Sequence, residues 1–109
     1  MSPSGRNKRR DERKFKRIFV RYGLKDTPHK AVAQQISASG FFLATNEVVY
    51  ANSSPVVVEI TGPAETWLVA GIVRYAIKVH PSLASFNKPG MGVELTLIPD
   101  ACRDYLASL

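Results

Sequence analysis

The feature that most constrains this chain is a series of short apolar-rich segments, several of which alternate apolar with polar residues. A period of two places successive side chains on opposite faces of a β-strand, so each alternating segment predicts a strand with one buried face, and the β-branched residues of 55–61 predict another strand. Glycine, proline and small polar residues separate the segments, which is typical of turns. The predicted strands are 18–24, 30–36, 41–45, 55–61, 67–79 and 91–98.

Closure is the simplest arrangement for these strands, because an open sheet leaves its edge strands unpaired whereas a closed barrel pairs every strand. The 109 residues suffice for one core but not for two ordinary domains. After the last strand, Pro99 and Asp100 resemble a helix start, and apolar residues follow at helical spacing. We therefore expect an all-β fold, a six-stranded antiparallel β-barrel, with a short C-terminal α-helix across one mouth.

Particular positions refine this expectation. Gly71 interrupts the apolar face of strand 67–79, which predicts a bulge or a close backbone approach. The single cysteine, Cys102, is predicted to be a buried small hydrophobe, because it has no partner for an internal disulfide. The large aromatic residues of the strands are assigned to the core, namely Phe41, Phe42, Trp67 and Tyr75.

Composition places the chain among soluble globular proteins, with 45% hydrophobic and 22% charged residues. No apolar run approaches the roughly 18 to 20 residues of a membrane-spanning helix, and the first residues lack the apolar stretch of a secretory signal. We expect a cytoplasmic protein without membrane insertion. Catalysis is not expected either, because His29 and His80 lie in predicted loops without metal-ligand spacing and no nucleophile or phosphate-loop motif occurs. The sequence predicts no enzyme, no metal and no cofactor.

The formal charge of +6 is concentrated at one end of the chain. Residues 6–17 hold eight basic and two acidic residues, whereas seven basic and seven acidic residues balance elsewhere. Long-range attraction for anions therefore comes from this segment. Within it, Arg13 and Arg17 are four residues apart and can project to the same side, with Phe15 between them as the expected anchor on the barrel. Two guanidinium groups so arranged suit phosphate, because each presents a planar fork of donors.

A second distinctive segment is the small, polar turn 35–40 between two predicted strands. Read as an ordinary hairpin, it has serine hydroxyls bonding backbone amides and Gly40 at a positive φ. Taken together with Arg13 and Arg17, the sequence resembles the PilZ domain family. That family has Arg-x-x-x-Arg before the first strand and Asp/Asn-x-Ser-x-x-Gly between the second and third. Arg13 and Arg17 match the first motif, and Ser37 and Gly40 match the second.

Residues 71–75 and 92–95 are also similar to the family's Gly-x-Val-x-aromatic and Gly-Val-x-Phe/Leu strands, so the resemblance spans 12–109. It implies a flexible basic arm, 1–11, followed by a PilZ-like barrel domain, 12–109. It further implies a receptor for the bacterial second messenger cyclic di-GMP that relays the signal to a protein partner controlling motility, pili or exopolysaccharide.

The implied ligand-binding residues are Arg13 and Arg17 on the arm and Gln35, Ser37 and Gly40 on the barrel. We expect the arm to fold over the bound ligand. The neighbouring arginines of the arm are either additional phosphate contacts or surface charge; they are Arg9 and Arg10.

Gln35 departs from the family pattern, because glutamine extends the acceptor oxygen of Asp or Asn by one methylene. Two other functions therefore remain open. One is a degenerate adaptor that acts through protein contacts without nucleotide. The other is a nucleic-acid binder that uses the basic arm, although the balanced charge of the barrel disfavours it.

Overall fold

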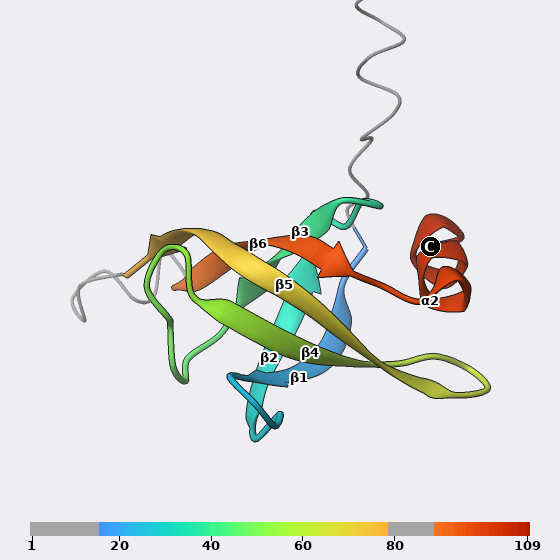
Figure 1. The fold of residues 1–109 in the computed structure, drawn as a ribbon, viewed down its shortest axis with the longest axis horizontal. Helices are drawn as coiled ribbons and strands as arrows, with labels where there is room; N and C mark the ends of the chain where they lie inside the picture. Colours follow the sequence, from blue (N-terminus) through green and yellow to red (C-terminus); the bar gives the residue numbers. More distant parts are fainter. Residues whose placement is uncertain (1–15, 79–88) are drawn as a thin grey trace, which may run out of the picture.

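The computed structural model describes residues 16–78 and 89–109 and confirms the predicted order of strands and helix (Figure 1). The ends of the elements differ from the predicted ones by at most two residues. The elements are β1 (Ile18–Gly23), β2 (His29–Gln34), β3 (Gly40–Ala44), β4 (Pro55–Thr61), β5 (Thr66–Ile77), β6 (Gly90–Leu97) and α2 (Asp100–Ala107).

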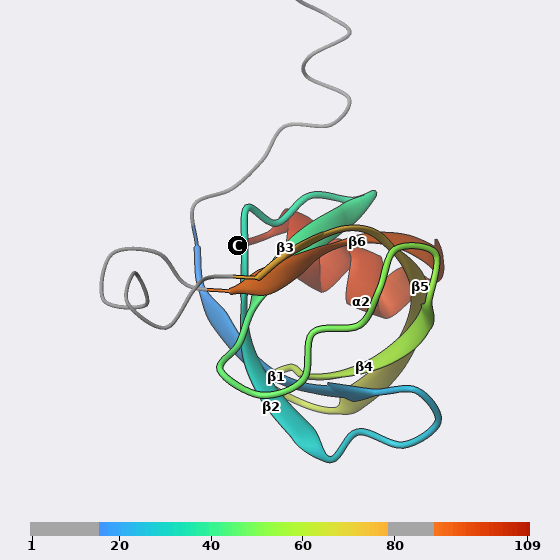
Figure 2. The ribbon, with the colours of Figure 1, turned by 90° about the vertical axis from the view of Figure 1, so that its left-hand side faces the viewer.

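The strands form a closed barrel in the order β1-β2-β3-β6-β5-β4, and every neighbouring pair is antiparallel. Figure 2 looks along this barrel and shows the strands as a ring. The order brings β6, the last strand that the structure describes, between β3 and β5. Closure thus gives every strand two hydrogen-bonded neighbours, as expected from the cost of exposed edges.

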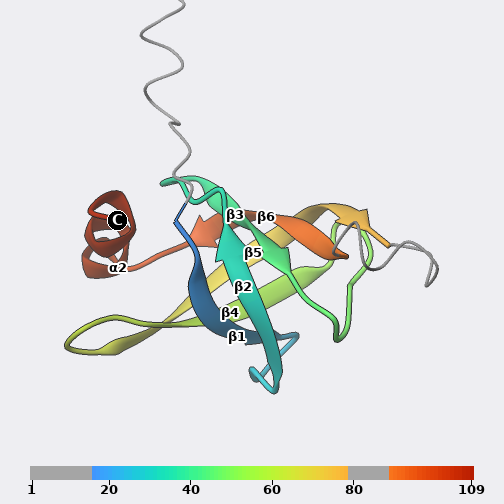
Figure 3. The ribbon, with the colours of Figure 1, turned by 180° about the vertical axis from the view of Figure 1, so that it is seen from behind.

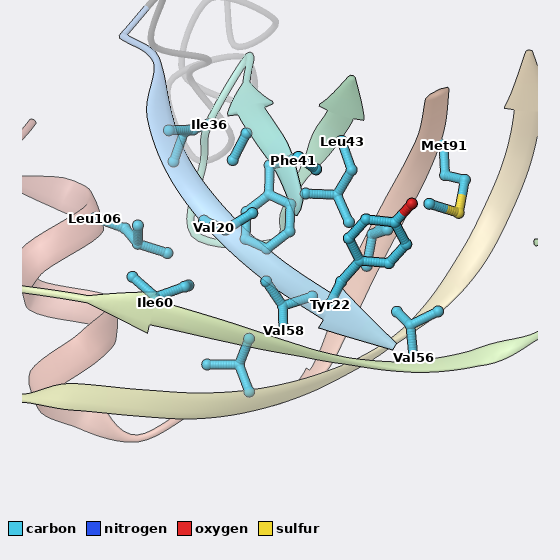
Figure 4. Packing of buried hydrophobic residues seen from close by; sticks show 14 of the residues in the cluster. Val20, Tyr22, Ile36, Phe41, Leu43, Val56, Val58, Ile60, Met91 and Leu106 are labelled. Carbon is cyan, nitrogen blue, oxygen red and sulfur yellow. The ribbon is translucent and has the colours of Figure 1, made fainter. Parts of the chain in front are cut away.

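The core lies inside the ring and is built from the inward-facing residues of all six strands. Figure 4 shows Tyr22 of β1 directed toward Phe41 and Leu43 of β3, with Val58 and Met91 beside them. All five side chains are almost fully buried. Their burial removes a large apolar area from water, which is the main favourable contribution to folding.

Helix α2 closes one mouth of the barrel, as predicted (Figures 1 and 3). Its buried side chains, Cys102 and Leu106, belong to the core cluster, and Tyr105 lies 5.5 Å from Trp67 of β5 between ring centroids. Burial raises the pKa of the Cys102 thiol to about 11, so the group is a neutral apolar filler near pH 7. No helix in the described ranges is long and apolar enough to cross a membrane.

The placement of His29 differs from the loop predicted for it. His29 begins β2, and its Nδ1 lies 3.1 Å from Oε1 of Glu47. Glu47 also accepts a hydrogen bond from the Lys30 amide, and these contacts lower the pKa of its carboxyl group. The strand includes the histidine because His29 pairs with Tyr22 in the β1–β2 ladder, where the two ring centroids lie 5.4 Å apart. His80 lies outside the described residues.

Two irregularities in the pairing of β5 with β6 determine what faces the outside of the barrel. The first lies between Ala70 and Gly71, where β6 carries the extra residue and its Glu94 carbonyl approaches Gly71 closely. It confirms the expectation of a bulge or a close backbone approach at that glycine. The second, between Val73 and Tyr75, was not predicted. The extra residue there breaks the alternation, so Tyr75 is 47% exposed rather than part of the core.

Candidate functional site

The turn between β2 and β3 carries the three predicted barrel residues of the site. Ser37 is buried, its amide donates to the Gly40 carbonyl at 2.9 Å, and its Oγ accepts from the Ser39 amide at 3.2 Å. The serine therefore holds the turn together, as expected for a hydroxyl that bonds backbone amides. The backbone geometry differs from the prediction. Gly40 has no positive φ, and Gln35 takes a φ of +50° instead.

Gly40 is required for a different reason, the close approach of β3 to β6. Gly40 is opposite Glu94 in the register, and a Cβ added to Gly40 would lie 2.1 Å from the Val93 carbonyl oxygen. Beyond this pair the turn bonds directly to β6, since the Leu95 amide donates to the Ser39 carbonyl at 2.8 Å. Glycine thus fixes the turn against the outer edge of β6.

A pocket of about 300 Å³ opens beside this turn on the outside of the barrel. Such a volume is at the lower end of small-molecule sites. The turn contributes one side of it and strands β3, β5 and β6 contribute the rest. The lining residues are Gln35, Ser39, Phe41, Phe42, Arg74, Tyr75, Gly92, Val93 and Glu94.

Two aromatic rings cover the strand backbone within the pocket. Phe42 on β3 and Tyr75 on β5 both pair with Gly92 of β6, and their ring planes are 23° apart with centroids separated by 6.2 Å. A Cβ on Gly92 would lie 2.1 Å from a carbon of the Tyr75 ring, and one on Gly90 would lie 2.5 Å from the Phe42 ring. The glycines of β6 therefore let the rings lie flat against the barrel.

A charged pair stands beside the aromatic rings. The Arg74 guanidinium donates through Nε to Oε1 of Glu94, with both side chains about half exposed. Arg74 comes from the bulged part of β5, and Glu94 lies opposite Ile72 of that strand. The pocket thus offers strong donors and strong acceptors next to a flat apolar surface. Among the described residues no cluster of metal-ligating side chains occurs.

Arg17 is the one residue of the predicted arm motif that the structure describes. It is exposed and immediately precedes Ile18, which is opposite Ala33 near the end of β2. The chain therefore enters β1 close to where Gln35 begins the β2–β3 turn. Arg13 and Phe15 lie outside the described residues, and so do the other predicted arm contacts, Arg9 and Arg10. The predicted division between arm and barrel, after residue 11, also lies outside them.

Of the nine residues that line the pocket, only Gln35 was predicted from the sequence as a ligand-binding residue. Those not predicted include Phe42, Arg74, Tyr75 and Glu94. Phe42 and Tyr75 were assigned to the core, and the charged residues were given no role. The available signal was the pair Gly90 and Gly92 at alternate positions of the last strand, which suggests close contact with large neighbours. Using that signal requires knowing that β6 lies between β3 and β5.

Comparison with known proteins supports the fold. No family model matches the chain, and no curated protein matches it. Among solved structures the chain is similar to the Bacillus subtilis inhibitor of motility, MotI/DgrA, with a TM-score of 0.68 and 17% sequence identity. The similarity covers 90% of this chain and 47% of that one, so the chain spans about half the length of its neighbour. The chain therefore has a PilZ-like β-barrel fold.

Proposed function

We propose that this chain is a cyclic di-GMP receptor that binds the ligand between its basic arm and the β2–β3 turn. The observation that carries the proposal is the Ser37–Gly40 turn, which opens onto a pocket of about 300 Å³ and lies close to where Arg17 leads into the barrel. The ligand supplies two phosphates for guanidinium groups and a flat base for a pocket with aromatic walls.

In this proposal the barrel is the fixed half of the site and the arm is the closing half. Ser37 and Gly40, both buried in the turn, shape the barrel wall of the ligand site. Arg13 and Arg17 hold phosphate, and the arm folds over the nucleotide when it binds. Ordering of the arm changes the surface offered to a partner protein in the cytoplasm. The signal is relayed without catalysis.

Calorimetric titration of the chain with cyclic di-GMP, combined with amide NMR spectra, tests the proposal. We expect saturable binding and large shifts of the amide signals of residues 6–17. Duplex DNA of random sequence is the control. Strongly salt-dependent binding to DNA without binding to the dinucleotide would favour the nucleic-acid function instead. A folded chain that binds neither ligand would favour the adaptor function.

Substitution of Gln35 by asparagine is expected to raise the affinity for cyclic di-GMP about tenfold. Asparagine places its oxygen one methylene closer to the backbone, and correcting one misplaced hydrogen bond is worth about 1 to 3 kcal/mol. Asparagine also tolerates the φ of +50° better than glutamine. Titration calorimetry measures the change. The matched control is Gln34→Asn, one residue earlier and at the end of β2, which should not raise the affinity.

A further inference from the structure

The pair formed by Arg74 and Glu94 presents complementary hydrogen-bonding groups at the edge of an aromatic surface. Arginine carries five N–H donors, of which the Nε contact with Glu94 uses one. An ionised carboxylate offers only acceptors. Both side chains line the same pocket as Tyr75, whose ring lies flat over Gly92. A planar ligand stacked on Tyr75 would therefore meet donors and acceptors side by side.

Guanine has the matching pattern on its edge. Its O6 and N7 are acceptors, for which arginine is the commonest specific partner. Next to O6, the ring N1–H and the 2-amino group are donors that suit a carboxylate. Adenine keeps the N7 acceptor but differs at the other three positions, since it has a 6-amino group, an unprotonated N1 and no 2-amino group. A site that pairs Arg74 with Glu94 accordingly favours guanine over adenine.

The carboxylate of Glu94 is unfavourable for the phosphates of the proposed ligand. Its effect on binding is therefore informative about its role. Glu94 is opposite Gly40 in the strand register, so it lies beside the turn that forms the barrel wall of the proposed phosphate site. A negative charge there repels phosphate unless it also contacts donors of the ligand. The sign of its effect on binding therefore distinguishes a residue that reads the base from one that only repels the ligand.

We propose that Arg74 and Glu94 recognise the edge of one guanine base while that base stacks on Tyr75, making these residues the determinants of base selectivity. This inference rests on the proposed receptor function. Arg74 donates to O6 and N7, and Glu94 accepts from N1–H and the 2-amino group. The pocket of about 300 Å³ suits one base rather than the whole dinucleotide.

Calorimetric titrations of the full chain with cyclic di-GMP, cyclic di-AMP and cyclic di-IMP test the proposal. The inosine compound keeps O6 and N1–H but lacks the 2-amino group. We expect cyclic di-GMP to bind about tenfold more tightly than cyclic di-IMP and at least a hundredfold more tightly than cyclic di-AMP. For Glu94→Gln, cyclic di-GMP affinity should fall about tenfold and its advantage over cyclic di-IMP should disappear.

The control for charge is Glu65→Gln, which removes an exposed carboxylate outside the pocket and should change no affinity. For stacking, Tyr75→Leu should weaken cyclic di-GMP binding about tenfold, and Tyr75→Phe should restore it. Thermal unfolding is measured for each variant to check that the variant is folded.

Three other outcomes would overturn the inference, and the last of them would overturn the receptor function as well. Tighter binding of cyclic di-GMP by Glu94→Gln would overturn the inference, because it would show that Glu94 only repels phosphate. Equal binding of all three dinucleotides by the wild-type chain would also overturn it, while leaving the receptor function intact. A folded wild-type chain that binds none of them would overturn the receptor function and the inference together.

Discussion

Substitution of Arg17 by alanine is expected to weaken cyclic di-GMP binding by roughly 10- to 150-fold. In the proposed complex Arg17 donates to a phosphate oxygen, and a hydrogen bond to a charged group contributes about 1.5 to 3 kcal/mol. The wild-type guanidinium is exposed, so its removal leaves no cavity and should not change the free energy of unfolding appreciably. Titration calorimetry at fixed ionic strength measures the loss, because phosphate contacts depend on salt.

Three further variants provide the comparisons for this prediction, and the first separates the guanidinium from its charge. Arg17→Lys keeps the charge but loses the planar fork of donors, so its affinity should lie between those of the wild type and Arg17→Ala. Arg103→Ala removes an exposed arginine of α2 that pairs with Asp100, and it should bind like the wild type. Arg13→Ala should resemble Arg17→Ala. Equal affinities of Arg17→Ala and Arg103→Ala for the ligand would contradict the proposed role of the arm.

Substitution of Gly40 by alanine is expected to destabilise the barrel by about 3 kcal/mol. The added Cβ would meet the Val93 carbonyl oxygen at 2.1 Å, which is a backbone atom held in the β3–β6 ladder and cannot rotate away. Either β3 separates from β6 or the turn shifts, and both changes disrupt hydrogen bonds. In thermal unfolding the midpoint should fall by roughly 10 to 15 °C for a domain of this size.

The control for this prediction is Ala38→Ser, in the same turn but exposed to solvent. It should change the free energy of unfolding by less than about 0.5 kcal/mol. Urea unfolding of both variants gives the comparison. If Gly40→Ala were as stable as Ala38→Ser, the close approach of the turn to β6 would not be the reason for glycine at this position.

Much of the fold could be predicted because it depends on local periodicity. The β-branched residues of strand 55–61 predicted β4 to the residue, and the helical spacing of apolar residues predicted α2, whose Cys102 is buried as expected. Gly71 correctly indicated an irregularity in the pairing of β5 with β6. Each of these features is encoded within a few neighbouring residues, because the faces of a strand or helix repeat over two to four positions.

The candidate site could be predicted only in part. The turn 35–40 was located correctly, but the residue with the positive φ is Gln35 and not Gly40. Glycine has two uses, conformational freedom and close approach, and the sequence does not distinguish them. Only the contact between Gly40 and the Val93 carbonyl shows which one applies.

The sequence by itself determined the strands, the helix, the turn and the uneven distribution of charge in this protein. The tertiary structure alone decided the pocket. Its residues come from three separate segments, 35–42, 74–75 and 92–94, which meet because β6 pairs with both β3 and β5. The outward position of Tyr75 follows from a register shift between β5 and β6. Both features depend on hydrogen bonds between strands distant in sequence, and no local pattern encodes which strands will pair.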